Sequence, residues 1–78
     1  MMTQIEMFEK VKNLVISKLD SNNEAQVTAK ATGQDFFFKS YDNGQTWHLY
    51  QGCDLVVGDV TFDYAVHSLI DVGYVFAK

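Results

Sequence analysis

Apolar residues follow two different spacings along the chain, and the spacing separates helices from strands. Through residues 4–19 they recur at helical spacing and cover an arc of roughly 200°, against about 100° for a minimal core-facing stripe. A second set follows Thr61 at i, i+3, i+4, i+7 and i+8, namely Phe62, Ala65, Val66, Leu69 and Ile70. The pattern predicts a helix near each end of the chain.

Both predicted helices carry recognisable start signals. Thr3 and Glu6 have the S/T-x-x-E spacing of a capping box. The second helix is predicted to begin after either Asp59 or Thr61, because both are N-cap residue types. Gly73 is predicted as the C′ residue that ends it.

The segment between the helices alternates with a period of two, which is typical of half-buried strands. The alternation and the turn residues predict a strand at each of residues 25–32, 35–41 and 45–51, and a short fourth strand at 53–57. Residues 74–77 are predicted to form a short last strand or an ordered tail. The expected fold is therefore α+β, with a three- to four-stranded antiparallel meander between two helices.

Length and composition limit the class of protein. A chain of 78 residues is expected to form a single α+β domain over residues 1–78. The lone cysteine, Cys53, cannot form an internal disulfide, which favours a reducing compartment. Neither a signal peptide nor a membrane-spanning run is apparent, so we expect a cytoplasmic protein without membrane association.

The net charge of −4 is unevenly distributed. Residues 1–39 hold five acidic residues and five lysines, whereas residues 40–78 hold five acidic residues and one lysine. The chain contains no arginine, the residue best suited to bidentate phosphate recognition. Nucleic-acid binding normally requires a basic patch, so the sequence argues against a direct nucleic-acid partner.

Residues 40–47 read SYDNGQTW and match the pattern S-x-D-x-G-x-T-W at Ser40, Asp42, Gly44, Thr46 and Trp47. The segment resembles the Asp boxes of sialidase-type β-propellers and of small microbial ribonucleases. In physical terms Asp42 can accept hydrogen bonds from turn amides, and Gly44 can supply a positive φ. The chain carries the motif once, it contains no arginine, and its lysines do not cluster near the hairpin, whereas both kinds of enzyme bind their substrates through cationic side chains. We interpret it as a structural turn.

Three other groups of residues suggest chemistry. His48 would be a general base near Cys53 or Tyr50, but we interpret it as a half-exposed strand histidine and Cys53 as a buried structural thiol. Asp63, His67 and Asp71 lie at i, i+4 and i+8 on one helical ridge. A metal there would need ligands from elsewhere, so we interpret the ridge as solvated and predict no metal or cofactor.

The aromatic hairpin and the acidic second half of the chain supply the predicted interaction surface. Alternation places Thr46, His48 and Tyr50 on one face of their strand, with Trp47 and Leu49 on the other. Only one face can meet the helices, so we expect some aromatic side chains to be exposed. The predicted interaction residues are Tyr41, Trp47, Tyr50, Asp54, Asp59, Asp63 and Asp71.

These features support several hypotheses about function. The first is a small acidic, non-enzymatic module that binds, or binds and inhibits, a more basic protein; in size and charge it resembles accessory proteins of phages and mobile elements. The alternative is a small-ligand or carbohydrate binder that uses Trp47 and Tyr50. A ribonuclease-like or thiol enzyme acting through His48 or Cys53 is less favoured. The broad apolar side of the first helix also suggests a homodimer.

Overall fold

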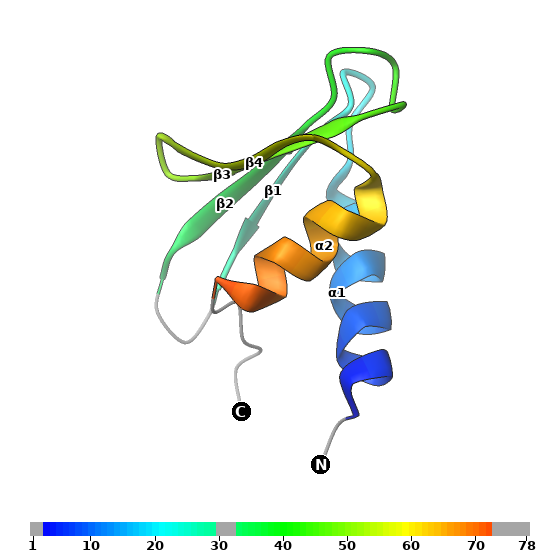
Figure 1. The fold of residues 1–78 in the computed structure, drawn as a ribbon, viewed down its shortest axis with the longest axis vertical. Helices are drawn as coiled ribbons and strands as arrows, with labels where there is room; N and C mark the ends of the chain where they lie inside the picture. Colours follow the sequence, from blue (N-terminus) through cyan, green and yellow to red (C-terminus); the bar gives the residue numbers. More distant parts are fainter. Residues whose placement is uncertain (1–2, 30–32, 73–78) are drawn as a thin grey trace.

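The computed structural model describes residues 3–29 and 33–72. Along the chain lie α1 (Gln4–Lys18), β1 (Glu24–Thr28), β2 (Asp35–Lys39), β3 (Trp47–Gln51), β4 (Asp54–Val60) and α2 (Phe62–Asp71) (Figure 1). The α+β prediction is confirmed. The predicted C′ residue and the predicted last strand at 74–77 lie outside the described residues.

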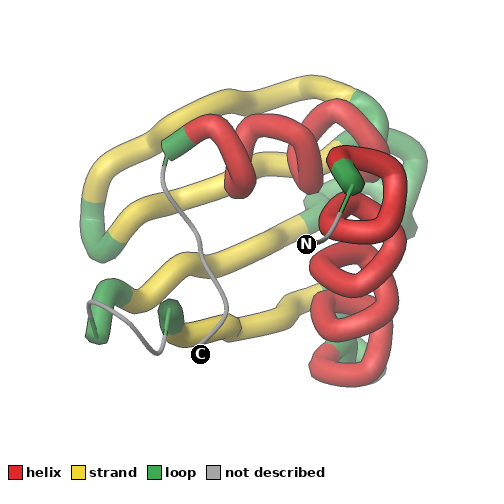
Figure 2. The backbone as a smooth tube through the Cα atoms, turned by 90° about the horizontal axis from the view of Figure 1, so that it is seen from below, coloured by secondary structure: helices red, strands yellow, loops and turns green. Residues whose placement is uncertain are grey.

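The four strands form one antiparallel sheet in the order β1-β2-β3-β4, so each strand pairs with its neighbour in sequence. Both helices lie on the same face of this sheet (Figures 1 and 2). α1 packs against β1, and α2 packs against β3 and β4. No described element covers the opposite face, which we call the open face.

The helix starts follow local hydrogen bonding. In α1 the Glu6 backbone N–H donates to Thr3 Oγ1 at 3.1 Å while the Glu6 side chain accepts from the Thr3 N–H, which confirms the capping box. Thr61 caps α2, where its Oγ1 accepts from the Tyr64 N–H at 3.1 Å. Asp59 is therefore not the cap. It lies within β4, with a φ of +57°.

The fourth strand is longer than predicted. It continues past residue 57 to Val60, which pairs with Trp47. Two register shifts interrupt the β3–β4 pairing, so β4 contains irregular positions that hide its alternation in the sequence. The second and third strands are shorter than predicted, because residues 40–46 form the hairpin connection instead of continuing the strands.

The core lies between the helices and the covered face of the sheet. Its buried apolar residues are Val11, Val15, Ala25, Val27, Ala29, Phe36, Phe38, Trp47, Leu49, Ala65, Val66 and Leu69. The small residue Ala25 on the covered face of β1 leaves room for α1, which packs against this strand. α1 also has more apolar surface than the core covers, because Ile5 is 76% exposed and Ile16 is 48% exposed. Within the described residues, no helix is long and apolar enough to span a membrane.

Candidate functional site: the open face of the sheet

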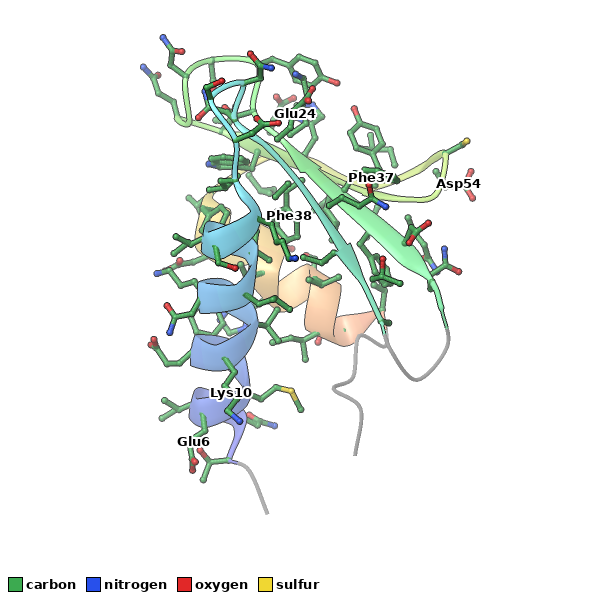
Figure 3. All side chains as sticks on the ribbon, turned by 180° about the vertical axis from the view of Figure 1, so that it is seen from behind. Glu6, Lys10, Glu24, Phe37, Phe38 and Asp54 are labelled. Carbon is green, nitrogen blue, oxygen red and sulfur yellow. The ribbon has the colours of Figure 1, made fainter. Side chains whose placement is uncertain are left out.

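Strand pairing places three large apolar or aromatic residues and one glutamine in a row across the middle of the open face. Gln26 pairs with Phe37, Phe37 with Tyr50, and Tyr50 with Leu55, so one residue from each strand lies side by side. Phe37 and Tyr50 are half-buried, and Leu55 is 57% exposed. Figure 3 shows Phe37 on the opposite side of the sheet from Phe38, which points into the core. We call these four residues the central row.

The next row toward the hairpin is charged and aromatic. Glu24 pairs with Lys39, and Lys39 pairs with His48. The Lys39 ammonium lies 2.5 Å from Glu24 Oε1 and 5.3 Å from the centre of the Tyr41 ring. The Lys39 ammonium is therefore held between the Glu24 carboxylate and the face of the Tyr41 ring.

Tyr41 folds back from the hairpin over the open face. Its hydroxyl lies 3.1 Å from the Tyr50 hydroxyl, and its ring meets His48 edge-on at 5.0 Å. The hydrogen bond with Tyr41, with burial as the second cause, raises the pKa of Tyr50 above its ordinary value. Tyr41 stays 64% exposed, so the open face presents it to solvent.

His48 is a packed residue of this face. Its side chain is 19% exposed, and its Nε2 lies 3.8 Å from Asp59 Oδ1. The ring covers Gly58, where an added Cβ would lie 2.9 Å from His48 Cδ2. Nδ1 is buried and has no hydrogen-bond partner among the described residues.

Cys53 corrects a sequence prediction. We expected a buried structural thiol, but Cys53 is exposed. It follows Gly52, whose φ of +61° forms the tight turn between β3 and β4, and a residue in such a turn has no core to enter. His48 lies near the other end of β3, so the two residues are not brought together as a catalytic pair.

The Asp-box segment forms the compact turn that the sequence predicts. Asp42 Oδ1 accepts from the N–H groups of Gln45 at 3.1 Å and Thr46 at 2.8 Å, and Asp42 Oδ2 accepts from the Thr46 hydroxyl at 2.6 Å. Ser40 Oγ accepts from the Gly44 N–H at 2.7 Å, and Gly44 has a φ of +88°. The side chains of Ser40, Asp42 and Thr46 thus make their hydrogen bonds within the turn itself.

Trp47 corrects the predicted interaction surface. It was expected among the exposed aromatics, but it is only 5% exposed and packs edge-on against Phe62 at 5.1 Å. Its indole N–H donates to the Gly44 carbonyl at 3.1 Å. Alternation places Trp47 on the covered face with Leu49, and α2 packs over that face, so Trp47 belongs to the core.

The four acidic residues of the predicted surface are exposed but do not form one cluster. Asp54 and Asp59 lie on β4, where Asp59 is beside His48 of the open face and has a side chain that is 86% exposed. Asp63 lies on α2, where its carboxylate pairs with Lys12 at 2.8 Å. Asp71 ends α2. The acidic surface is thus divided between the sheet and the helices.

Two residues of the helical ridge formed by Asp63, His67 and Asp71 contact α1. The His67 ring stacks on Phe8 with 4.2 Å between ring centres, while Asp63 is paired across the helices. Within residues 3–29 and 33–72, no three His, Cys, Asp or Glu side chains are grouped closely enough to hold a metal ion.

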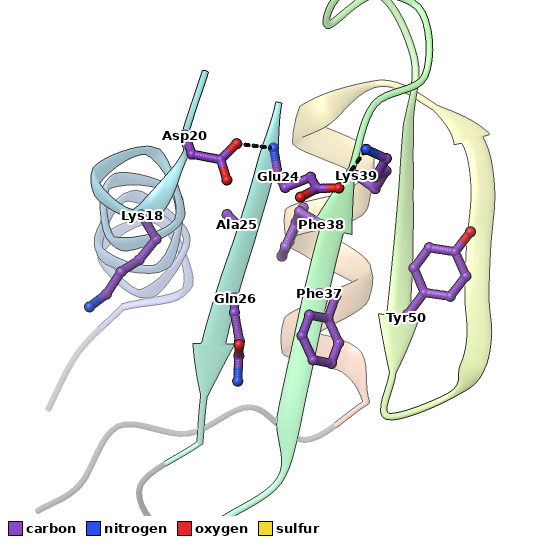
Figure 4. Close-up of a pocket in the computed structure, with 9 residues that line it drawn as sticks. All are labelled: Lys18, Asp20, Glu24, Ala25, Gln26, Phe37, Phe38, Lys39 and Tyr50. Atoms are coloured by element: carbon purple, nitrogen blue, oxygen red, sulfur yellow. Dashed lines mark hydrogen bonds and ion pairs between the residues drawn. The ribbon is translucent and has the colours of Figure 1, made fainter. Parts of the chain in front are cut away.

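A groove of about 500 Å³ lies over β1 and β2, beside the central row (Figure 4). Gln26, Phe37 and Tyr50 of the central row line it, Asp20, Glu24 and Lys39 lie at one end, and Lys18 lies beside β1 (Figure 4). The groove thus combines an apolar floor with charged side chains.

Phe37, Leu55 and Glu24 belong to the open face but were not among the predicted interaction residues. The run Phe36-Phe37-Phe38 contains the signal for one of them, since alternation must place Phe37 on the face opposite its two neighbours.

Comparison of the chain with protein-family models, with curated proteins and with solved structures finds no match. The site itself is therefore the basis for any functional proposal.

Proposed function

We propose that the chain is a non-enzymatic binding module that docks a more basic protein on its open face. The observation that carries the proposal is the central row, in which half-buried Phe37 and Tyr50 and exposed Leu55 lie side by side on a face that no described element covers. Aromatic side chains that are already partly desolvated and held by strand pairing are typical anchors of protein interfaces.

The charges around the central row favour a basic partner. Asp35 and Asp59 border the face and have no lysine within ion-pair distance among the described residues. Lys39, in contrast, is already paired with Glu24. A cationic surface would therefore meet a negative rim, and its Lys or Arg side chains could stack on Tyr41.

The proposal retains the sequence-based expectation of a cytoplasmic accessory protein of phage or mobile-element type. Such a protein would act by covering the cationic site of its partner, which would inhibit that partner without any chemistry. The exposed apolar residues of α1 support a different contact, a homodimer, which the same experiment separates from docking on the open face.

The test is affinity capture from a microbial lysate at low and high salt, followed by measurement of Kd for the purified partner. Leu55→Ser and Tyr50→Ser should each weaken binding at least tenfold, since hot-spot truncations cost about 2 kcal/mol or more. Ile5→Ser is the matched control, because Ile5 is equally apolar and 76% exposed but lies on α1. Unchanged affinity in both open-face variants contradicts the proposal, and a loss confined to Ile5→Ser favours a helix-mediated contact.

A carbohydrate ligand is the second candidate, and the pairing of Phe37 with Tyr50 is what favours it. Adjacent aromatic rings with a neighbouring amide, Gln26, suit the apolar and polar faces of a sugar ring. Trp47 is buried and cannot report such binding directly. Titration of a glycan panel followed by amide chemical shifts tests the candidate: shifts centred on Phe37 and Tyr50 support it, and unchanged spectra reject it.

A further inference from the structure

Among the described strands, β1 has a neighbour on one side only, and we call its other side the free edge. The Asn23 carbonyl accepts from the Ser40 N–H, and the Ala29 N–H donates to the Gln34 carbonyl, so residues 23 and 29 direct these groups toward the β2 side. The Glu24 carbonyl and N–H instead meet Asp20, on the side away from β2. Because this direction alternates along a strand, even-numbered residues of β1 face the free edge.

Gln26 and Thr28 therefore present their backbone N–H and C=O groups at this edge. No backbone hydrogen bond to these groups comes from another described residue outside the strand ladder. Glu24 differs, since its edge-facing groups are occupied by Asp20 at 3.0 Å and 3.2 Å. The Asp20 turn thus closes one end of the edge and leaves the stretch beyond it open for pairing.

The groove described above runs along this same edge. Figure 4 shows Gln26 and Phe37 beside each other on the open face, with Asp20 and Glu24 at one end. A strand placed against β1 would fill the groove from its side, and it would extend the central row beyond Gln26. The carboxylates of Asp20 and Glu24 would lie near its outward-facing side chains.

We propose that the basic partner contributes an extended segment that adds to β1 as a fifth, antiparallel strand. The inference rests on the proposed function and specifies how the partner is held. The segment exchanges hydrogen bonds with Gln26 and Thr28, and its residues at those positions point toward the open face, because directly opposed residues share a face. Basic side chains at these positions lie on the side of the sheet that carries the carboxylates of Glu24 and Asp35. The residues between them lie on the covered side, with Val27.

This geometry makes a test possible before the natural partner is known. The probe is a synthetic peptide of alternating lysine and valine. If lysines occupy the open face, their N–H groups are the ones that point to β1, while the valine N–H groups point away. N-methylation of the lysines should then weaken binding at least tenfold, whereas N-methylation of the valines should leave it nearly unchanged. The two methylated peptides have the same composition and charge.

Binding is followed by titration of isotopically labelled protein, with amide hydrogen exchange at Gln26 and Thr28. We expect slower exchange at both amides in the complex. On the protein side, Gln26→Pro removes the edge-facing N–H without removing a ladder bond and should weaken binding about tenfold. Gln26→Ala keeps the N–H and serves as its control.

Several results would overturn the strand-addition proposal. They are the absence of binding up to about 1 mM peptide, equal binding of the two methylated peptides, or unchanged exchange at Gln26 and Thr28. If the captured partner still depends on Leu55 and Tyr50 in such a case, the open-face proposal stands and only the strand addition fails. If the peptides behave as expected but the affinity of the partner is unchanged by substitution of Leu55 and Tyr50, the edge is the binding site and the open face is not.

Discussion

Asp42 and Thr46 are joined through both the backbone and the side chain of Thr46. The Thr46 N–H lies 2.8 Å from Asp42 Oδ1, and the Thr46 hydroxyl lies 2.6 Å from Asp42 Oδ2. A carboxylate that accepts several hydrogen bonds favours its charged form, and these bonds, with Thr46 as the largest cause, lower the pKa of Asp42 to about 2. The hairpin therefore depends on an ionised Asp42.

This pKa shift predicts how the hairpin responds to acid. Because the pKa is lowered on folding, the stabilisation is complete above the unfolded value of about 4 and is lost as the pH falls toward 2. Asp42→Asn should lower Tm at pH 7, and the difference from the unmodified protein should shrink between pH 4 and pH 2. Thermal unfolding across this range measures it. Asp71→Asn, at an exposed position, is the control, and an equal pH dependence there would contradict the assignment.

Burial of Trp47 predicts both a stability cost and a fluorescence property. Trp47→Ala should lower the free energy of unfolding by about 3–5 kcal/mol, because a large core side chain leaves a cavity. Tyr64→Ala, at a 58% exposed aromatic position, should change it by less than about 1 kcal/mol. Acrylamide should quench Trp47 emission weakly in the folded protein and strongly in urea. Strong quenching in both states would place Trp47 on the surface.

The contact between His48 and Gly58 predicts a non-additive pair. Gly58→Ala should destabilise the fold by about 1–3 kcal/mol, because the new Cβ would overlap the His48 ring. His48→Ala removes that ring, so the alanine at position 58 should cost much less in the double variant. Urea unfolding of the four proteins gives the coupling. Equal costs in the two backgrounds would show that the ring does not limit position 58.

Exposure of Cys53 predicts thiol reactivity in the folded state. Ellman's reagent should titrate one thiol per chain without denaturant, at a rate within about tenfold of that in urea, because burial does not protect it. Oxidation should yield a disulfide-linked dimer, which Cys53→Ser abolishes. A thiol that reacts only after unfolding would restore the prediction made from sequence.

The regular parts of the fold could be predicted because capping residues and the spacing of apolar residues both indicate the same element there. Thr3 and Glu6 specify a capped helix start, and Ala25 and Val27 specify the buried face of β1 by strict alternation. β4 was predicted too short because its register shifts break the alternation. The alternation of apolar and polar residues cannot by itself identify a strand whose register shifts at a bulge.

The candidate site was predicted only in part, for a similar reason. Sequence identifies aromatic and acidic residues, and Tyr41 and Tyr50 do lie on the open face. Which face the helices cover decides the rest, and that is a property of tertiary packing. It placed Trp47 in the core and Phe37 on the open face. The short turn after Gly52 likewise exposed Cys53, although cysteine as a residue type is usually buried.

The order β1-β2-β3-β4 also has a consequence for folding. Each strand pairs with the strand made immediately before it, and the Asp42 turn is stabilised by its own residues, so the sheet can be assembled in the direction of synthesis. The covered face is completed only by Leu69 and the other buried residues of α2, the last of the described elements. A nascent chain would therefore present a paired sheet with an unfinished core, and docking of α2 would complete it.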